Sequence, residues 1–274
     1  MFFKPMRLPF FIILCLTILL SSCSQYQEVL RKDDIGKKYA FADSLYQMGK
    51  YRKGLKLMEQ IVPLYRGKPQ GEKLMFIYAN TYYNLEDYYL AGYQFERFTQ
   101  AYPQSDSVEV ASFKSAKSFY ELSPRFSLDQ RDTHKGLEKL QEFINTYPNS
   151  DKRMEANELV AELREKLEKK EFKTAAQYLH VEDYKSAIEA FDNFITDNPG
   201  SIYRREAFFN RFVSAYKLAI NSIPSLVQER LDIAKGHYKN FMKYYKDTDL
   251  ASEAVEIYED IERRTVTEET TPTI

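Results

Sequence analysis

The side chains best suited to catalysis or metal binding are few and widely separated in this chain. The three histidines, His134, His180 and His237, lie far apart, and none has a cysteine nearby. A zinc site brings about four such ligands together, so we expect each histidine to face solvent instead. The sequence also contains no glycine-rich phosphate loop and no HExxH or GxSxG motif. It therefore predicts no metal, no cofactor and no enzymatic activity.

One thiol is placed for covalent modification. Residues 8–20 form an apolar run that follows Lys4 and Arg7 and is short for a membrane span. The run ends in Leu20-Ser21-Ser22-Cys23. This segment resembles the lipobox of bacterial lipoproteins, which implies cleavage of residues 1–22 and lipidation of Cys23. The alternative is an ordinary secretory leader with a chance cysteine.

Cysteine usage agrees with an exported lipoprotein. The only other cysteine is Cys15, inside the leader, so the mature body would contain no disulfide. Ser24 follows Cys23, and in the lipoprotein family a residue other than Asp there is compatible with sorting to the outer membrane. The resemblance thus implies a periplasm-facing domain anchored by lipid to that membrane, with residues 23–36 as lipidated cysteine and tether.

A second set of side chains suits recognition of a peptide. Aromatic rings, an amide and a cation together would accept a peptide that ends in an aromatic residue and a carboxylate. The alternative is that these residues only pack between helices. The set lies in the first helices of the first two predicted hairpins and comprises Tyr39, Asp43, Tyr46, Lys73, Phe76, Asn80 and Tyr83.

A repeated sequence pattern predicts the helices that carry these residues. Similar phrases, AYPQSD, TYPNSD, DNPGSI and YYKDTD, begin at residues 101, 146, 197 and 244. A small residue and two apolar residues precede each phrase, and a fourth residue lies within it. Their spacing is 4, 3 and 4, as in Ala91, Phe95, Phe98 and Tyr102, which places them on one face of an α-helix. Proline commonly follows, because it cannot continue a helix. A fifth, upstream copy begins at Gly54.

A second helix precedes each of these helices. In the second unit, Ala79 and Tyr82 lie 12 and 9 residues before Ala91. The combined pattern resembles the tetratricopeptide repeat, a helix–turn–helix unit of about 34 residues. Extra residues interrupt the third and fifth units, at 123–136 and 221–230. Residues 151–179 are rich in helix formers and predict a spacer helix followed by the first helix of unit four.

The predicted fold is therefore an all-α solenoid of about five hairpins. Scarce Gly (9) and Pro (10) favour long helices over a turn-rich β fold. The net charge of −1, which becomes −3 without the two leader cations, argues against nucleic-acid binding. The domain spans 37–264, and a disordered tail is expected at 265–274. The predicted repeats are 37–70, 71–106, 107–151, 168–202 and 203–249, with a C-terminal helix at 250–264.

The combination of lipobox and repeats resembles the BamD family, lipoproteins of the β-barrel assembly machinery. The phrases QEFINTYPNSD (141–151) and NPGSIYRREAFF (199–209) contribute to this resemblance. It implies that the chain binds unfolded outer-membrane proteins and docks the POTRA domains of the β-barrel insertase. The family's docking arginine matches Arg205, with Arg204 adjacent. The alternative for Arg205 is a surface ion pair with Glu206 or a neighbour.

Two other kinds of lipoprotein would share much of this pattern. One is a different periplasmic tetratricopeptide scaffold, such as a secretin pilotin or a coordinator of peptidoglycan synthesis. The other is a nutrient-binding lipoprotein, but the insertions in this chain are too short to build a ligand pocket. In the first repeat, Arg66 stands where the BamD family tends to have Pro. The shape of the groove at that repeat is therefore left open.

Overall fold

The computed structural model describes residues 25–269. The leader (1–22) with Leu20, Ser21 and Ser22, the lipidation site Cys23 and the last residues (270–274) lie outside this range. Residues 25–269 contain helices and no strand, which confirms the all-α class. No helix within that range has both the length and the apolar character needed to cross a membrane. The chain divides into two compact units.

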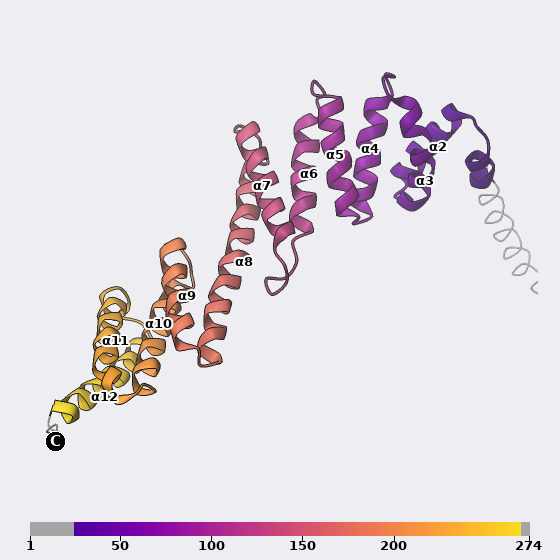
Figure 1. The fold of residues 1–274 in the computed structure, drawn as a ribbon. Helices are drawn as coiled ribbons and strands as arrows, with labels where there is room; N and C mark the ends of the chain where they lie inside the picture. The colour runs from indigo at the N-terminus through magenta and orange to yellow at the C-terminus, as the bar shows by residue number, and fades with distance from the viewer. Residues whose placement is uncertain (1–24, 270–274) are drawn as a thin grey trace, which may run out of the picture. The chain divides into compact units, whose positions relative to one another are not determined.

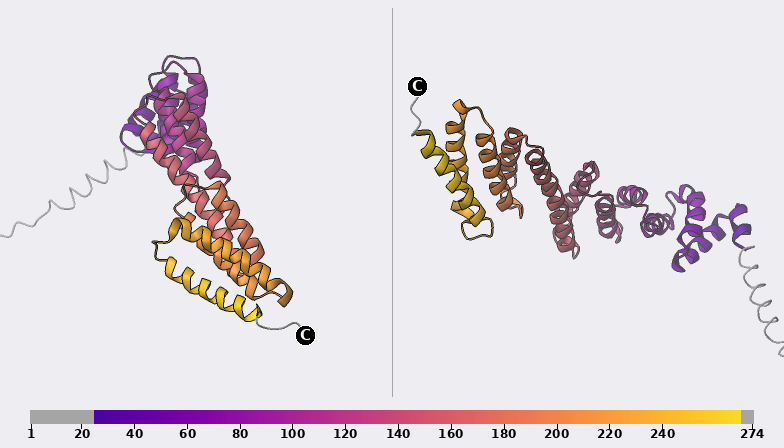
Figure 2. Two further views of the ribbon diagram at one scale, coloured as in Figure 1. Left: turned by 90° about the vertical axis from the view of Figure 1, so that its left-hand side faces the viewer. Right: turned by 90° about the horizontal axis from the view of Figure 1, so that it is seen from below.

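Unit 1 comprises the described residues up to Ser123 together with Arg131–Val160. Successive helices contact one another and form antiparallel hairpins in chain order (Figures 1 and 2). A short 3-10 helix, η1 (Val62–Tyr65), ends the first hairpin. The α-helices are α2 (Ile35–Gln47), α3 (Tyr51–Ile61), α4 (Gly71–Asn84), α5 (Tyr88–Ala101), α6 (Val108–Glu121) and α7 (Arg131–Thr146).

Unit 2 comprises Pro124–Gln130 and the chain from Ala161 onward. Its helices also contact in chain order, as the ring of Phe172 on α8 does with Phe191 on α9 at 6.0 Å. The second insertion is mostly a longer helix, because α11 already begins at Pro224. The helices are α8 (Arg153–His180, begun in unit 1), α9 (Tyr184–Asp197), α10 (Arg204–Ile220), α11 (Pro224–Tyr245) and α12 (Ala251–Glu269).

The expectation of a separate spacer helix in 151–179 is wrong. Helix α8 runs without a break from Arg153 to His180, for 28 residues. The segment contains neither Gly nor Pro, so nothing in its backbone ends the helix before the turn of the fourth repeat.

Both ends of the solenoid are more ordered than the sequence predicts. Residues 25–31, assigned to the tether 23–36, are helical, because Tyr26 is buried against the first hairpin and the partly buried Val29 and Leu30 pack beside it. At the other end, α12 continues to Glu269, although the tail was expected to be disordered from residue 265. A helix can continue there without an apolar face, because its hydrogen bonds are internal. The Thr265 hydroxyl adds one to the Ile261 carbonyl at 2.9 Å.

The repeat positions fill the two cores. The small residues Ala42, Ala79 and Ala91 of unit 1 and Ala175, Ala187 and Ala234 of unit 2 are buried. Large aromatic and aliphatic repeat residues are completely buried beside them, as the 4-3-4 spacing predicts: Met58, Phe95, Phe98, Leu140, Phe143, Phe191, Phe194 and Phe241. Tyr178 is an exception. It matches the repeat pattern but is 39% exposed.

The turns inside the hairpins share one backbone geometry. Gly49, Glu86 and Glu182 occupy equivalent positions and have positive φ angles of 68°, 62° and 63°. In the second and fourth hairpins an aspartate follows and caps the next helix, since Asp87 accepts from Leu90 N and Asp183 from Ser186 N. These turns fix how the two helices of each hairpin meet.

Candidate functional site

A hydrogen-bonded row of polar side chains crosses three first helices of unit 1. Its members are Tyr46 on α2, Asn80 on α4 and Lys114 on α6, and neighbours are 34 residues apart. That separation is one repeat length, so the three residues occupy equivalent positions. The Lys114 ammonium donates to Asn80 Oδ1, and Asn80 Nδ2 donates to the Tyr46 hydroxyl oxygen. The row therefore connects three successive hairpins.

The chemistry of the row fixes the direction of each hydrogen bond. An ammonium group only donates, so the Asn80 carbonyl oxygen must face Lys114 and its NH₂ group must face Tyr46. The Tyr46 oxygen is then the acceptor, and its own hydrogen is left for another acceptor. Asn80 is buried, which holds the row in place. A ligand with a negatively charged oxygen would meet two donors, Lys114 and Tyr46.

Lys114 is a half-buried cation without a negative partner. Its Nζ lies 5.3 Å from the ring centroid of Tyr83 and 6.0 Å from that of Phe95. No carboxylate within residues 25–265 forms an ion pair with it, whereas Lys117, one turn further along α6, pairs with Glu155 at 2.7 Å. Burial, and then the charge of Lys117, lower the pKa of Lys114. A bound carboxylate would compensate this buried charge.

Two of the predicted groove residues pair with each other beside the row. Lys73 Nζ contacts Asp43 Oδ2 at 2.7 Å, and this hydrogen bond raises the pKa of Lys73. The other oxygen of Asp43, Oδ1, is buried without a hydrogen-bond partner. The ring of Tyr39 lies 5.2 Å from that of Tyr65, in the packing between α2 and η1. Lys73 thus has a counter-charge, unlike Lys114.

Phe76 and Tyr83 differ in what they contact. The half-buried Phe76 ring packs edge-on against Phe95 and Phe98 of α5, at 5.9 and 5.5 Å. Tyr83 lies under the Lys114 ammonium. The row therefore contains Tyr46 and Asn80 from the predicted set, with Tyr83 beside it. Sequence reasoning missed Lys114, although its 34-residue spacing from Asn80 was a usable signal.

The two arginines predicted to dock a partner lie at the start of α10 in unit 2. Arg205 Nη1 contacts Asp249 Oδ1 at 3.1 Å, and Arg205 Nη2 is 3.8 Å from Glu206 Oε1. The guanidinium of Arg204 lies 5.0 Å from the centre of the Phe208 ring, and its Nε is buried without a partner. The ion pairs considered from the sequence are therefore present. Asp249 is largely exposed, so a stronger acidic partner can displace it.

Arg211 and His237 form a second charged cluster in unit 2. Arg211 is buried and pairs with Asp192, and its guanidinium lies 4.9 Å from the centre of the Phe208 ring. His237 was expected to face solvent, but it is half-buried and its Nδ1 has no hydrogen-bond partner. That expectation is wrong because α11 presents this position to the buried Arg211. His134 and His180 are exposed.

The pKa of His237 predicts how the stability of unit 2 depends on pH. Burial, and then the positive charge of Arg211, lower this pKa below the ordinary 6.5. The unfolded chain therefore takes up a proton before the folded chain does, and stability falls as pH drops through 6.5. We expect His237→Gln to flatten this part of a plot of unfolding free energy against pH. Exposed His134→Gln is the control and should leave the slope unchanged. An unchanged slope in His237→Gln would contradict the assignment.

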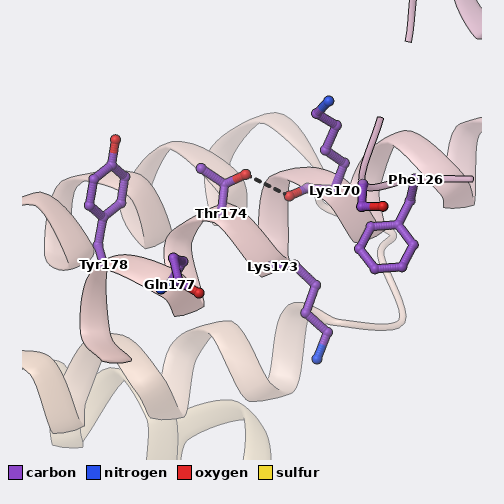
Figure 3. Close-up of a pocket in the computed structure, with 7 residues that line it drawn as sticks. Phe126, Lys170, Lys173, Thr174, Gln177 and Tyr178 are labelled. Carbon is purple, nitrogen blue, oxygen red and sulfur yellow. Dashed lines mark hydrogen bonds between the residues drawn. The ribbon is translucent and has the colours of Figure 1, made fainter. Parts of the chain in front are cut away.

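A pocket in unit 2 is a weaker candidate for ligand binding. It has a volume of about 480 Å³, and the insertion residues Phe126 and Ser127 line it opposite α8. Lys170 Nζ on α8 donates to the Leu128 carbonyl at 2.5 Å, and this hydrogen bond connects the insertion of the third repeat to α8. Figure 3 shows the ammonium groups of Lys170 and Lys173 pointing to opposite sides. The Thr174 hydroxyl donates to the Lys170 carbonyl at 2.9 Å, so donors do not converge in this pocket.

The described residues contain no cluster of His, Cys, Asp or Glu that could hold a metal ion. The polar groups that could form hydrogen bonds or ion pairs with a ligand lie in the row of unit 1 and around Arg205 of unit 2.

Comparisons with known proteins give the family and similar folds. A comparison with curated protein sequences found no match. Among solved structures, the TPR2AB-domain:pHSP90 complex of yeast Sti1 has a TM-score of 0.38 and 12% identity, covering 83% of this chain and 98% of that one. A Podosopora anserina kinesin light chain protein with TPR-like repeats has a TM-score of 0.33 and 12% identity, covering 85% and 96%. Likenesses this distant carry no functional argument.

The family model is more specific. The model YfiO, described as outer membrane lipoprotein, matches residues 32–231, most of the chain. The matched range includes the Tyr46–Asn80–Lys114 row and Arg205. This chain therefore belongs to the YfiO family of outer membrane lipoproteins, the family of the BamD proteins that its sequence resembles.

Proposed function

We propose that this protein is a non-enzymatic subunit of the β-barrel assembly machinery. In this proposal unit 1 binds the carboxy-terminal segment of unfolded outer-membrane proteins, and unit 2 docks the periplasmic POTRA domain of the insertase. The protein needs no cofactor beyond the lipid on Cys23, and it faces the periplasm from the outer membrane. Family membership supports a role at the outer membrane, and the uncompensated Lys114 carries the proposal for unit 1.

Lys114 supports a carboxylate ligand for a physical reason. Partial burial of a cation is costly unless an opposite charge or several acceptors compensate it. Here the ammonium makes one hydrogen bond to an amide oxygen and contacts two aromatic rings, so donor hydrogens remain for an anionic acceptor. The Tyr46 hydroxyl supplies a second donor. A peptide that ends in an aromatic residue and a free carboxylate would pair its carboxylate with Lys114 and stack its ring beside Tyr83.

Docking at Arg205 gives a prediction for unit 2. The Arg205 side chain is 39% exposed and is held by the exposed acid Asp249, so an acidic residue of the insertase can replace that contact. We expect Arg205→Glu to reduce recovery of the insertase with the tagged lipoprotein about tenfold, because attraction becomes repulsion at the interface rim. The helical circular dichroism signal should stay unchanged, because the side chain is at the surface.

Arg205→Lys and Asp249→Asn are the matched controls for this measurement. The lysine keeps the charge, and the asparagine frees Arg205 from its internal partner, so neither should reduce recovery strongly. Normal recovery of the insertase with Arg205→Glu would overturn the docking assignment.

The experiment that tests the proposed function as a whole is purification of the tagged protein from detergent-solubilised envelopes, with mass spectrometry of its partners. A near-stoichiometric β-barrel protein with POTRA domains would support the proposal. Recovery of a secretin or a cell-wall synthase instead would replace it with the alternative of another periplasmic scaffold. Depletion of this lipoprotein from cells gives an independent readout, since loss of an assembly factor should lower the amounts of many outer-membrane β-barrel proteins at once.

A further inference from the structure

The first hairpin of unit 1 carries a cluster of exposed cations. Lys50, Arg52, Lys53 and Lys56 are all exposed at the start of α3 or just before it. None of them forms an ion pair with another residue of the described chain. The apolar side chain of Met48, in the turn before α3, is 62% exposed. Together these five residues form the α3 cationic face.

This face includes a shallow depression. Its volume is about 450 Å³, and it is open to solvent. Three of the six residues around it are cations: the lining comprises Gly49, Lys50, Tyr51, Arg52, Lys53 and Leu85. No acidic residue is among them, so the depression suits a negatively charged group such as a phosphodiester.

The face lies beside the first described residues of the chain. The Tyr26 hydroxyl donates to the Lys53 carbonyl at 3.3 Å, and Lys53 Nζ lies 5.4 Å from the centre of the Tyr26 ring. Only Ser24 separates Cys23 from Gln25, where the helical segment 25–31 begins. Since an extended residue spans at most about 3.6 Å, the connection between the lipidated residue and this helical segment is short.

We infer that the α3 cationic face binds anionic phospholipid headgroups of the membrane that holds the lipid on Cys23. The inference rests on the lipidation included in the proposed function. So short a connection keeps Lys53 and its neighbours close to the lipid headgroups. There each cation increases the affinity for an anionic membrane surface several-fold. Met48 adds an apolar side chain that can enter the interface. Because the acyl chains already provide the anchor, the cations set the orientation of unit 1 on the membrane.

A single-cysteine probe tests this contact in the full-length lipidated protein. The lipid blocks the Cys23 thiol and Cys15 lies in the leader, so Met48→Cys provides one reactive thiol. It is labelled with a fluorophore, and the protein is reconstituted into vesicles that contain nitroxide-headgroup lipid as quencher. The vesicles are phosphatidylcholine alone or an equal mixture with phosphatidylglycerol. We expect quenching to be at least about twofold stronger with phosphatidylglycerol and to weaken at high salt.

Two sets of substitutions separate charge from simple proximity. Neutralising the face should abolish the difference in quenching between the two kinds of vesicle. This variant combines Lys50→Gln, Arg52→Gln, Lys53→Gln and Lys56→Gln. The charge-conserving set Lys50→Arg, Lys53→Arg and Lys56→Arg should keep this difference. Circular dichroism checks that both variants remain folded.

The outcomes distinguish this inference from the proposed anchoring. Two results would overturn the inference alone, provided that mass spectrometry shows an acylated Cys23. One is equal quenching in both kinds of vesicle, and the other is a phosphatidylglycerol effect that remains in the variant with four Lys or Arg→Gln substitutions. An unacylated Cys23 in the mature protein would overturn both the anchoring and the inference.

Discussion

Lys114→Met is expected to remove most of the affinity of this protein for a peptide with a free carboxyl terminus. Methionine has a similar length and can keep the contacts with Tyr83 and Phe95, but it cannot donate a charged hydrogen bond. A hydrogen bond to a charged group contributes about 1.5–3 kcal/mol, so the dissociation constant should rise about ten- to a hundredfold. Fluorescence anisotropy with a labelled peptide ending in Phe measures this change.

An amidated peptide turns the same measurement into a test of mechanism. The wild-type protein should bind the free acid more tightly than the carboxamide by a similar factor, because only the acid pairs with Lys114. In Lys114→Met this preference should disappear. Lys117→Met is the matched control on the same helix, since Lys117 already pairs with Glu155 at 2.7 Å and does not need a carboxylate from the peptide. A Lys114→Met variant that still prefers the acid would show that the carboxylate binds elsewhere.

The pH dependence of binding follows from the same residue. Burial and the neighbouring Lys117 lower the pKa of Lys114 in the free protein, and a bound carboxylate would raise this pKa again. The complex then retains a proton that the free protein loses as pH rises. Affinity should therefore decline at alkaline pH, beginning at the lowered pKa of the free protein, and binding should take up protons there. Lys114→Met should remove this decline.

The sequence predicts the hairpins well because their packing is local. The small and aromatic residues that repeat at 4-3-4 spacing, such as Ala91, Phe95 and Phe98, are completely buried. Each pair of helices has to bury one such face against the next, so the period of the pattern determines the architecture. The ends of helices follow a weaker rule. The uninterrupted α8 depends on the absence of Gly and Pro from residues 153–180, and the extension of α12 to Glu269 depends on backbone hydrogen bonds, so the repeat pattern determines neither boundary.

The candidate site is harder to predict because it depends on contacts between repeats. The helical positions of Tyr46 and Asn80 predict a groove, but Lys114 lies in the third repeat, where an insertion interrupts the pattern. Phe76 depends on such contacts as well. Its type suits a peptide groove, and its half-buried ring also packs against Phe95 and Phe98. His237 is half-buried for the same kind of reason, namely a partner on another helix. A residue's type gives its chemistry, whereas its exposure comes from the packing of other elements.

Gly71→Ala is expected to destabilise unit 1 by about 3 kcal/mol, toward the upper end of what overpacking costs. Gly71 is buried at the first position of α4, where η1 and α5 both approach it. A Cβ atom there would lie 2.3 Å from the Tyr65 carbonyl oxygen and 2.8 Å from the Tyr102 hydroxyl. The Tyr65 oxygen is backbone and accepts a hydrogen bond from Lys68 N at 3.0 Å, so it cannot simply rotate away. Alanine would therefore push α4 away from the first hairpin.

Hydrogen exchange locates this loss within the chain. Protection should fall in α3 and α4 of Gly71→Ala while α10 and α11 of unit 2 keep theirs, and urea unfolding followed by circular dichroism should show an earlier first transition. Gly236→Ala is the matched control. This glycine lies inside α11, where an added Cβ meets nothing within 4 Å, so alanine should stabilise the helix by roughly 0.5–1 kcal/mol. If Gly71→Ala were as stable as the wild type, α4 would have to lie further from Tyr65 than the structure places it. The hydrogen bond between Tyr46 on α2 and Asn80 on α4 would then also be longer than in the structure.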